Sequence, residues 1–327
     1  MQFDKIFITI SSANEKDLKQ TISSAISNAE SPKDISFGVF DICMNNNDKN
    51  NFNDFDNVFY MPMKFNGTMG VGLSRLIASS IIPPDFNYVL QIDGHMLFTK
   101  NWDLELKKYY KILESKFEKP IISSRVPDWS YDDNNKVIID GLIIDDINNF
   151  EYKKINKTSK LIFKNYKEAL IKDGYPTVEG IEFSDDDFVE HNLISAHFTF
   201  SKSDLYREIL HDPRLPWGGD EPIYALRAWT RGYRMFSIKP TICFHYNKKS
   251  SLISYGKHPK DDWRHLDNND KRLLDFYIFR YKNGQKIMKD ILLGKYFGYW
   301  GSPNFKKLKE FEESCNISFK NFYSTKK

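Results

Sequence analysis

Long apolar runs are missing from this sequence of 327 residues. No stretch approaches the roughly 18 apolar residues that indicate a membrane-spanning helix. The apolar run at 6–10 is too short for the core of a signal peptide, and no basic segment precedes it. We therefore expect a protein without a membrane span that is located in the cytoplasm.

Cysteine is scarce as well. The three cysteines, Cys43, Cys243 and Cys315, are odd in number and lie far apart in the chain. This spacing argues against a disulfide framework and against a cysteine zinc site. A reducing compartment is the simplest environment for such a chain.

A large excess of charge of one sign is also lacking. Lys and Arg number 47 and Asp and Glu number 44, which gives a net charge of +3. This balance produces no global field that would favour nucleic acid, and we expect no nucleic-acid partner. Hydrophobic residues make up 41% of the chain, which is enough to bury a substantial core in one large domain or two.

The N-terminal third alternates strand-like and helix-like patterns. Apolar runs at 5–11 and 35–42 predict buried strands, and the segment 15–28 between them predicts a helix with one apolar face. This alternation is typical of a parallel sheet with helical crossovers, and it predicts an α/β fold.

A further apolar run, from Val89 to Phe98, presents Asp93 and His95. Because side chains at i and i+2 of a strand point the same way, we expect this carboxylate and imidazole to reach one divalent cation together. The carboxyl end of a strand is also where α/β sheets bind nucleotides. The alternatives are a capping role for Asp93 and a hydrogen-bonded core position for His95.

A glycine-rich segment at 67–75 leads into a predicted helix that stops before Pro83. Its glycines do not complete a dinucleotide-binding fingerprint, which argues against a dehydrogenase. A helix N-terminus with Arg75 close to it favours an anion such as phosphate. The alternative for Arg75 is an ion pair at the surface.

Two glycines precede two acidic residues in the segment 216–222, Pro-Trp-Gly-Gly-Asp-Glu-Pro. The glycines permit a turn that delivers Asp220 and Glu221 to the start of a helix predicted over 222–231. One of these candidate catalytic carboxylates would bind substrate hydroxyls or orient an acceptor. The alternative is that the helix dipole alone accounts for acidic residues there.

Four short motifs carry a specific resemblance to a known family. They are Gln91–Met96, Trp102-Asp103, Arg227–Tyr233 and Phe244-His245-Tyr246. With them, most of the chain resembles the UDP-GlcNAc-dependent polypeptide α-N-acetylglucosaminyltransferases, which act on hydroxyls of cytoplasmic proteins. The resemblance implies a retaining enzyme that moves N-acetylglucosamine from UDP-GlcNAc to a hydroxyl acceptor, on a protein.

A more distant similarity extends to the polypeptide N-acetylgalactosaminyltransferases. Their Asp-Ser-His and Trp-Gly-Gly-Glu-Asn motifs correspond to Asp93-Gly94-His95 and Trp217–Glu221 of this sequence. Both families have the GT-A glycosyltransferase fold, so the resemblance implies a Rossmann-like mixed sheet flanked by helices.

The expected organisation follows from this fold. We predict a catalytic domain over 1–250, in which the irregular segment 128–190 is an elaboration on the acceptor side. Residues 251–327 are predicted to form a C-terminal helical extension packed on that domain. Within it, Lys257, His258 and Arg264 are candidates for a mobile lid.

Carried over to this sequence, the resemblance assigns Asp93, His95 and His245 as metal ligands, with Mn²⁺ or Mg²⁺ as the ion. Two departures are evident: Gly94 stands where the distant relatives have serine, and Asp220-Glu221 stand where they have Glu-Asn. Which of the two acids contacts the sugar therefore stays open. The residues assigned to donor binding are Ser11, Ser12, Glu15, Asp41, Arg75, Asp93, Gly94, Trp217, Gly218 and Gly219.

The implied ligand set suits this reaction. A divalent cation acts as a Lewis acid that stabilises a departing diphosphate, and one carboxylate with two imidazoles suits Mn²⁺. Two other classes stay open at this point: a metal-dependent hydrolase that breaks the UDP-sugar without an acceptor, and a non-catalytic binding module. A transferase for a glycan or small-molecule acceptor is a further alternative.

Overall fold

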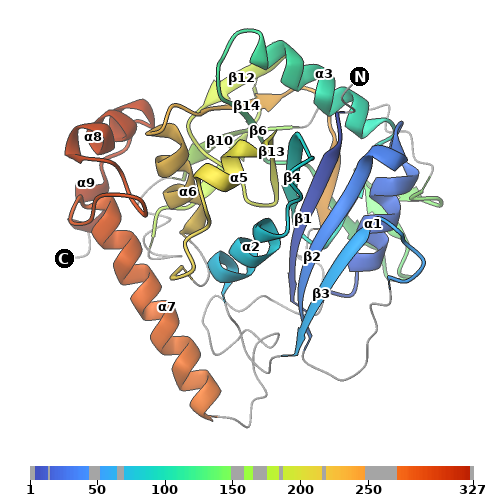
Figure 1. Ribbon diagram of the computed structural model, residues 1–327, viewed down its shortest axis with the longest axis horizontal. Helices are drawn as coiled ribbons and strands as arrows, with labels where there is room; N and C mark the ends of the chain where they lie inside the picture. The colour runs from blue at the N-terminus through green and yellow to red at the C-terminus, as the bar shows by residue number, and fades with distance from the viewer. Residues whose placement is uncertain are drawn as a thin grey trace.

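An eight-stranded sheet forms the centre of the protein (Figure 1). The structure is a computed structural model that describes residues 4–13, 15–43, 52–64, 70–148, 158–164, 175–183, 187–215, 219–246 and 271–324. The strands of this sheet are β1 (Ile6–Ala13), β2 (Ile35–Cys43), β3 (Val58–Lys64), β4 (Tyr88–Ile92), β6 (Pro120–Ser123), β12 (Phe188–His191), β13 (Phe198–Lys202) and β14 (Arg234–Ile238).

The strand order is β12-β14-β6-β13-β4-β1-β2-β3. The strands β1 to β4 pair in parallel, whereas β13 runs antiparallel to both β4 and β6. The expected alternation of strand and helix is therefore present in the N-terminal third, and the sheet as a whole is mixed.

Helices cover both faces of the sheet (Figure 1). The side chains of β1 alternate, so that Ile6, Ile8 and Ile10 share one core with helices α1 (Leu18–Ser27) and α3 (Trp102–Glu114). Phe7 points the other way, into a core that includes α5 (Asp204–Glu208) and α6 (Asp220–Trp229). Helix α2 (Val71–Ser80) packs on β1 and β2.

A second sheet adjoins the first. It has the order β5-β15-β7-β8-β9, and its strands are β5 (Met96–Phe98), β15 (Cys243–Tyr246), β7 (Asp128–Tyr131), β8 (Val137–Ile139) and β9 (Leu142–Ile144). The short strands β10 (Lys160–Phe163) and β11 (Val178–Ile181) pair with each other.

The apolar run at 137–144 is a tight hairpin. Asp140 and Gly141 have φ angles of 51° and 78°, and two successive residues with positive φ make the turn that suits the twist of a two-stranded hairpin. This turn separates β8 from β9.

The run from Val89 to Phe98 does not form one strand, and this prediction was wrong. Strand β4 ends at Ile92 in the large sheet, while β5 begins at Met96 and pairs with β15 in the second sheet. Asp93, Gly94 and His95 form the bend between them. The first part of this run pairs in the large sheet, and its last part pairs in the second sheet. The bend between them lets the backbone form hydrogen bonds in both sheets.

The C-terminal helices lie along one side of the molecule, beside α6 (Figure 1). They are α7 (Lys271–Leu292), α8 (Phe305–Ser314) and α9 (Phe319–Ser324). Met288 of α7 and Phe311 of α8 are buried in the same core as Ile223 of α6. In the part of the chain that the structure describes, no helix is long and apolar enough to cross a membrane.

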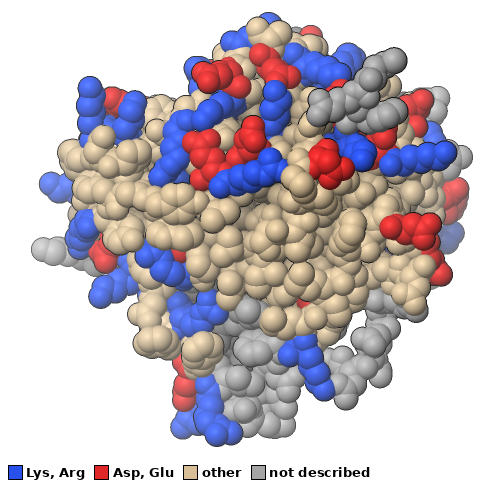
Figure 2. All heavy atoms as spheres, in the orientation of Figure 1, with Lys and Arg blue, Asp and Glu red and all other residues tan. Residues whose placement is uncertain are grey.

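Charges of both signs are interleaved on the face drawn in Figure 2. Around α3, in the upper part of this view, Lys and Arg side chains alternate with Asp and Glu, while the middle of the face is largely uncharged. Lys111 forms an ion pair with Asp4, and Lys119 forms one with Glu208.

Candidate active site

The bend after β4 brings one carboxylate and two imidazoles together. Strand β15 pairs antiparallel with β5, and His245 lies opposite Met96. The backbone N–H of Tyr246 donates to the carbonyl of His95 over 3.1 Å, which ties the bend to β15. His95 Nε2 and His245 Nε2 are 3.0 Å apart, and Asp93 Oδ2 lies 3.4 Å from His245 Nε2.

This cluster offers three donor atoms to one metal ion. One atom from each of Asp93, His95 and His245 lies within 4.8 Å of the other two. Two donors that bind an octahedral ion at about 2.1 Å and at right angles are about 3 Å apart, which matches the separation of the two Nε2 atoms. The sequence could not supply this spacing, because Asp93 and His95 lie in one bend and His245 lies on a distant strand.

The electrostatic setting favours the protonation states that ligands need. Burial would raise the pKa of Asp93, but a hydrogen bond from His245 and the nearby His95 and Arg75 hold it well below its ordinary value. Burial lowers the pKa of His245 and outweighs the effect of Asp93. The carboxylate is therefore ionised and the imidazole neutral at neutral pH.

Arg75 links this cluster to the start of α6. Its guanidinium donates to Asp220 and lies 3.5 Å from Asp93 Oδ1. Although burial opposes it, the charges of Asp220 and Asp93 raise the pKa of Arg75. The side chain of Arg75 is only 12% exposed. The alternative of an ion pair between solvated groups at the surface therefore does not apply to Arg75.

The two acids of α6 have different surroundings. The helix begins at Asp220, two residues before the predicted start, directly after Gly219 with φ 78°. Glu221 Oε1 accepts a hydrogen bond of 2.8 Å from the backbone N–H of Ala196. Burial and the charge of Asp220 raise the pKa of Glu221 to about 7. Asp220 is thus held by a cation, whereas Glu221 is poised to exchange a proton near neutral pH.

The carboxyl ends of β1 and β2 bring two further predicted residues together. Ser12 lies opposite Asp41 in the parallel register. Asp41 is fully buried, and its Oδ2 accepts a hydrogen bond of 2.9 Å from the hydroxyl of Tyr60. Within the described ranges, the buried Oγ of Ser12 has no hydrogen-bond partner, which suits a ligand group. Ser11, one residue earlier, points to the opposite face of the sheet.

Glu15 and Gly94 lie next to the metal-ligand cluster. Glu15 Oε2 is 3.5 Å from His95 Nδ1. A Cβ atom added to Gly94 would lie 3.5 Å from the Cβ and Cγ of Glu15. The structure thus places Glu15, assigned by resemblance to donor binding, against an imidazole of the cluster.

Some predicted residues fall outside the described ranges. These are Trp217 and Gly218 of the Trp-Gly-Gly segment and Lys257, His258 and Arg264 of the predicted lid.

Two further groups that line the site could not be predicted from the sequence. Tyr60, which holds Asp41, lies on a short strand whose sequence carries no functional motif. The ring of His197 lies 4.7 Å from the ring of His245, and its Nδ1 is 2.7 Å from Ser195 Oγ. Burial and the neighbouring His245 place the pKa of His197 well below its ordinary value. The sequence around His197 predicts that this residue packs or forms a hydrogen bond, and it does not indicate the contact with His245.

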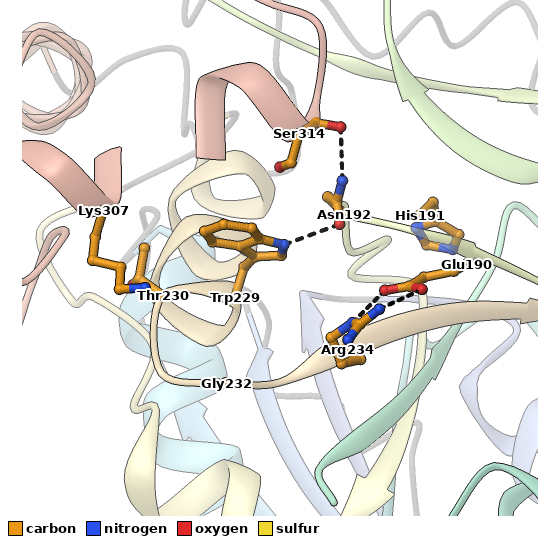
Figure 3. Close-up of a pocket in the computed structure, with 9 residues that line it drawn as sticks. All are labelled: Glu190, His191, Asn192, Trp229, Thr230, Gly232, Arg234, Lys307 and Ser314. Carbon is orange, nitrogen blue, oxygen red and sulfur yellow. Dashed lines mark hydrogen bonds and ion pairs between the residues drawn. The ribbon is translucent and has the colours of Figure 1, made fainter. Parts of the chain in front are cut away.

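A cleft of about 550 Å³ lies elsewhere, at the opposite end of α6 (Figure 3). Arg234 on one side forms an ion pair with Glu190. Trp229 donates to Asn192, which in turn donates to the carbonyl of Ser314 in α8. The polar groups that line this cleft form hydrogen bonds and an ion pair with one another. We therefore do not include the cleft in the candidate site. Its lining residues are Glu190, His191, Asn192, Trp229, Thr230, Gly232, Arg234, Lys307 and Ser314.

Comparison with known proteins gives both a family and structural relatives. A family model described as Glycosyltransferase (GlcNAc) matches residues 41–320. The structure is similar to the crystal structure of GalNAc-T7 with UDP, GalNAc and Mn²⁺, with a TM-score of 0.54 and 14% identity over 98% of this chain. The match spans 56% of the GalNAc-T7 chain, so this likeness bears on the fold.

A second solved structure is more distant. It is Staphylococcus aureus TarS 1–349 in complex with UDP-GlcNAc, with a TM-score of 0.47 and 11% identity over 95% of this chain and 81% of that chain. A search of curated protein sequences finds no match.

Proposed function

Because this chain belongs to the Glycosyltransferase (GlcNAc) family and has the GT-A fold, we propose that it is a retaining glycosyltransferase. It moves N-acetylglucosamine from UDP-GlcNAc to a hydroxyl acceptor, on a protein. The observation that carries the proposal is the convergence of Asp93, His95 and His245 within 4.8 Å. These residues would hold Mn²⁺ or Mg²⁺, which as a Lewis acid stabilises the departing diphosphate. The presence of UDP, GalNAc and Mn²⁺ in the similar GalNAc-T7 structure supports the donor class and the ion.

The proposed donor site runs from the ends of β1 and β2 to the metal ligands. The buried Asp41 carboxylate and the Ser12 hydroxyl, which has no hydrogen-bond partner among the described residues, lie side by side and would bind the uridine. Arg75 reaches both Asp93 and Asp220, and its charge would favour the diphosphate or the sugar beside it.

The acids of α6 are proposed to hold the sugar. Asp220 is fixed by Arg75, and Glu221 is fixed by the N–H of Ala196. A carboxyl with a pKa of about 7 can donate a hydrogen bond to a sugar oxygen or accept one from a sugar hydroxyl. Both groups are anchored by the scaffold, so they would orient the sugar without rearrangement.

Retention of configuration follows if the acceptor attacks from the face that the diphosphate leaves. In the proposed step, the bond between the anomeric carbon and the phosphate oxygen breaks. A new bond to the acceptor oxygen forms, and the acceptor proton passes to the leaving phosphate. This route needs no enzyme nucleophile. The absence of a nucleophile from this route agrees with the positions of the described carboxylates Asp93 and Asp220, because both face the Arg75 guanidinium.

We place the acceptor side at residues 128–190. Strand β7 of this segment pairs with β15, which carries His245, and the ring of Tyr131 packs 5.7 Å from that of Tyr246. A cleft of about 640 Å³ lies between Tyr131, Ile144 and the outer side of α1. Its nearness to the His245 strand makes it the proposed approach for the acceptor.

One experiment separates this function from its alternatives. The purified protein is incubated with UDP-GlcNAc and Mn²⁺, with and without peptide, glycan and small-molecule acceptors, and UDP release is followed. Release stimulated by a peptide acceptor, with transfer of N-acetylglucosamine confirmed by mass spectrometry, is expected. Equal release without acceptor would indicate a hydrolase, stimulation by a glycan alone would change the acceptor class, and no release with several UDP-sugars would indicate a binding module.

A matched pair of variants ties the activity to the metal ligands. Asp93→Asn keeps the shape of the side chain but removes its charge, and we expect transfer to fall by about 100-fold or more. Asp85→Asn lies just before the same strand, on an exposed side chain paired with Lys5, and should leave transfer unchanged. Full activity of Asp93→Asn would contradict the proposed metal site.

A further inference from the structure

The two ring nitrogens of His95 have different surroundings. Nε2 faces the metal-ligand cluster, 3.0 Å from His245 Nε2 and 3.9 Å from Asp93 Oδ2. Nδ1 is buried and makes no hydrogen bond of regular geometry within the described ranges. The acidic group that faces it is Glu15, with Oε2 at 3.5 Å.

A ligating imidazole fixes where its own proton lies. A neutral imidazole carries one N–H, so if Nε2 binds a metal ion, the proton must be on Nδ1. That N–H is buried, and leaving it without an acceptor would destabilise this tautomer. A carboxylate in front of Nδ1 removes this cost and, by its charge, favours the tautomer that binds metal.

Packing against Gly94 helps to fix the position of Glu15. Glu15 lies between the end of β1 and the start of α1, and its side chain is 12% exposed. Its stem packs over Gly94, because a Cβ on Gly94 would contact both Glu15 and Leu18 at 3.4–3.5 Å. The carboxylate is therefore held over the same bend that presents His95.

We propose that Glu15 is a positioning residue for the metal site. Its carboxylate accepts the Nδ1–H of His95, holds the ring in the tautomer whose Nε2 faces Asp93 and His245, and so sets the affinity for the ion. Glu15 is not itself a ligand in this scheme, because it faces the nitrogen on the other side of the ring. The inference rests on the metal site of the proposed function, but it concerns metal affinity and not transfer.

The first test measures metal affinity without any sugar nucleotide. Mn²⁺ binding to Glu15→Ala, Glu15→Gln and the unaltered protein is measured by isothermal titration calorimetry. We expect Glu15→Ala to bind about 10–100-fold more weakly, and Glu15→Gln to bind with intermediate affinity because its amide oxygen still accepts a hydrogen bond. Glu30→Ala, an exposed acid beyond α1, is the control and should bind normally. Equal affinity in Glu15→Ala would overturn the proposal.

The second test reads the tautomer directly and needs no alanine variant to fold. Zn²⁺ serves as a diamagnetic probe, and long-range ¹H–¹⁵N spectra show which nitrogen of His95 carries the proton. We expect Nδ1–H, with a proton resonance that shifts in Glu15→Gln. A proton on Nε2, or an Nδ1–H resonance that Glu15→Gln does not move, would refute the role of Glu15. Neither readout depends on transferase activity, so failure of this inference and failure of the proposed function are distinguishable.

Discussion

Single residues in the site are held by opposed charges. Arg75 lies between Asp93 and Asp220, so both carboxylates keep a partner when buried. Glu221 is held by a hydrogen bond from the backbone N–H of Ala196. A hydrogen bond from His245 and the nearby His95 and Arg75 keep the pKa of Asp93 low, whereas burial and the charge of Asp220 raise the pKa of Glu221.

Glu221→Gln should therefore stabilise the protein at alkaline pH while transfer falls. A carboxyl with a higher pKa in the folded state than in the unfolded state contributes stability below pH 4.5, and this is lost as the pH rises through about 7. Because glutamine does not ionise, the variant escapes this loss, and its advantage should reach about 1–3 kcal/mol at pH 8.5. Urea unfolding of the metal-free proteins at pH 5.5 and 8.5 measures it. A difference that does not grow with pH would contradict the assignment.

Contacts between single side chains of the site could not be predicted from the sequence. The proximity of Asp93 and His95 was inferred from a strand that does not exist, and they lie together because a bend joins two sheets. His245 was assigned as a metal ligand only through the resemblance, because a sequence pattern does not indicate the distance between residues that lie 150 positions apart. The contact of Glu15 with His95 Nδ1 depends on the packing of Gly94 and could not be predicted from any sequence pattern.

At the scale of elements, the turn before α6 sets the position of both acids. Gly219 has φ 78°, a conformation that glycine adopts without strain. A Cβ at this position would lie 1.9 Å from Sδ of Met288 in α7. The turn is thus constrained by its own backbone and by a helix from the C-terminal segment.

Gly219→Ala should destabilise the protein and lower transfer, because either the turn or Met288 must move. The left-handed backbone costs about 1 kcal/mol and the overlap about 1–3 kcal/mol more. Gly232→Ala is the matched control, since Gly232 follows the same helix with φ 88° and nothing lies within 4 Å of its added Cβ. Thermal and urea unfolding compare the two variants. Equal losses would show that Met288 does not constrain the turn.

Most elements could be predicted from periodicity, and the exceptions have physical causes. The sequence after Trp102 predicts a helix to about residue 117, which is α3, and the run at 120–124 predicts a strand, which is β6. The pattern of α6 predicts Arg227 on a polar side of the helix, but the side chain is fully buried. Its guanidinium donates to the carbonyls of Leu210 and Tyr299. A charge that satisfies distant backbone carbonyls follows from tertiary contacts and leaves no trace in local periodicity.

At the scale of the whole molecule, the C-terminal helices complete a core that begins at the N-terminus. Phe7 of β1 and Phe311 of α8 belong to the same buried cluster. The aromatic residues in the sequence of this segment predict either that they anchor its helices on the main body or that they stack on an acceptor. We propose that the segment is a structural part of the catalytic body, and that the division at residue 250 does not separate two independently stable units.

Phe311→Ala tests this proposal through the cooperativity of unfolding. Phe311 is fully buried, and its ring lies 5.7 Å from that of Trp229 on α6. Truncating such a side chain costs about 3–5 kcal/mol, and if the molecule unfolds as one unit, this loss should shift a single urea transition seen alike by circular dichroism and by Mn²⁺ binding. Phe305→Ala, on the same helix but 55% exposed, should change stability by less than about 0.5 kcal/mol. An early, separate transition that leaves Mn²⁺ binding intact would show instead that α7–α9 fold apart from the site.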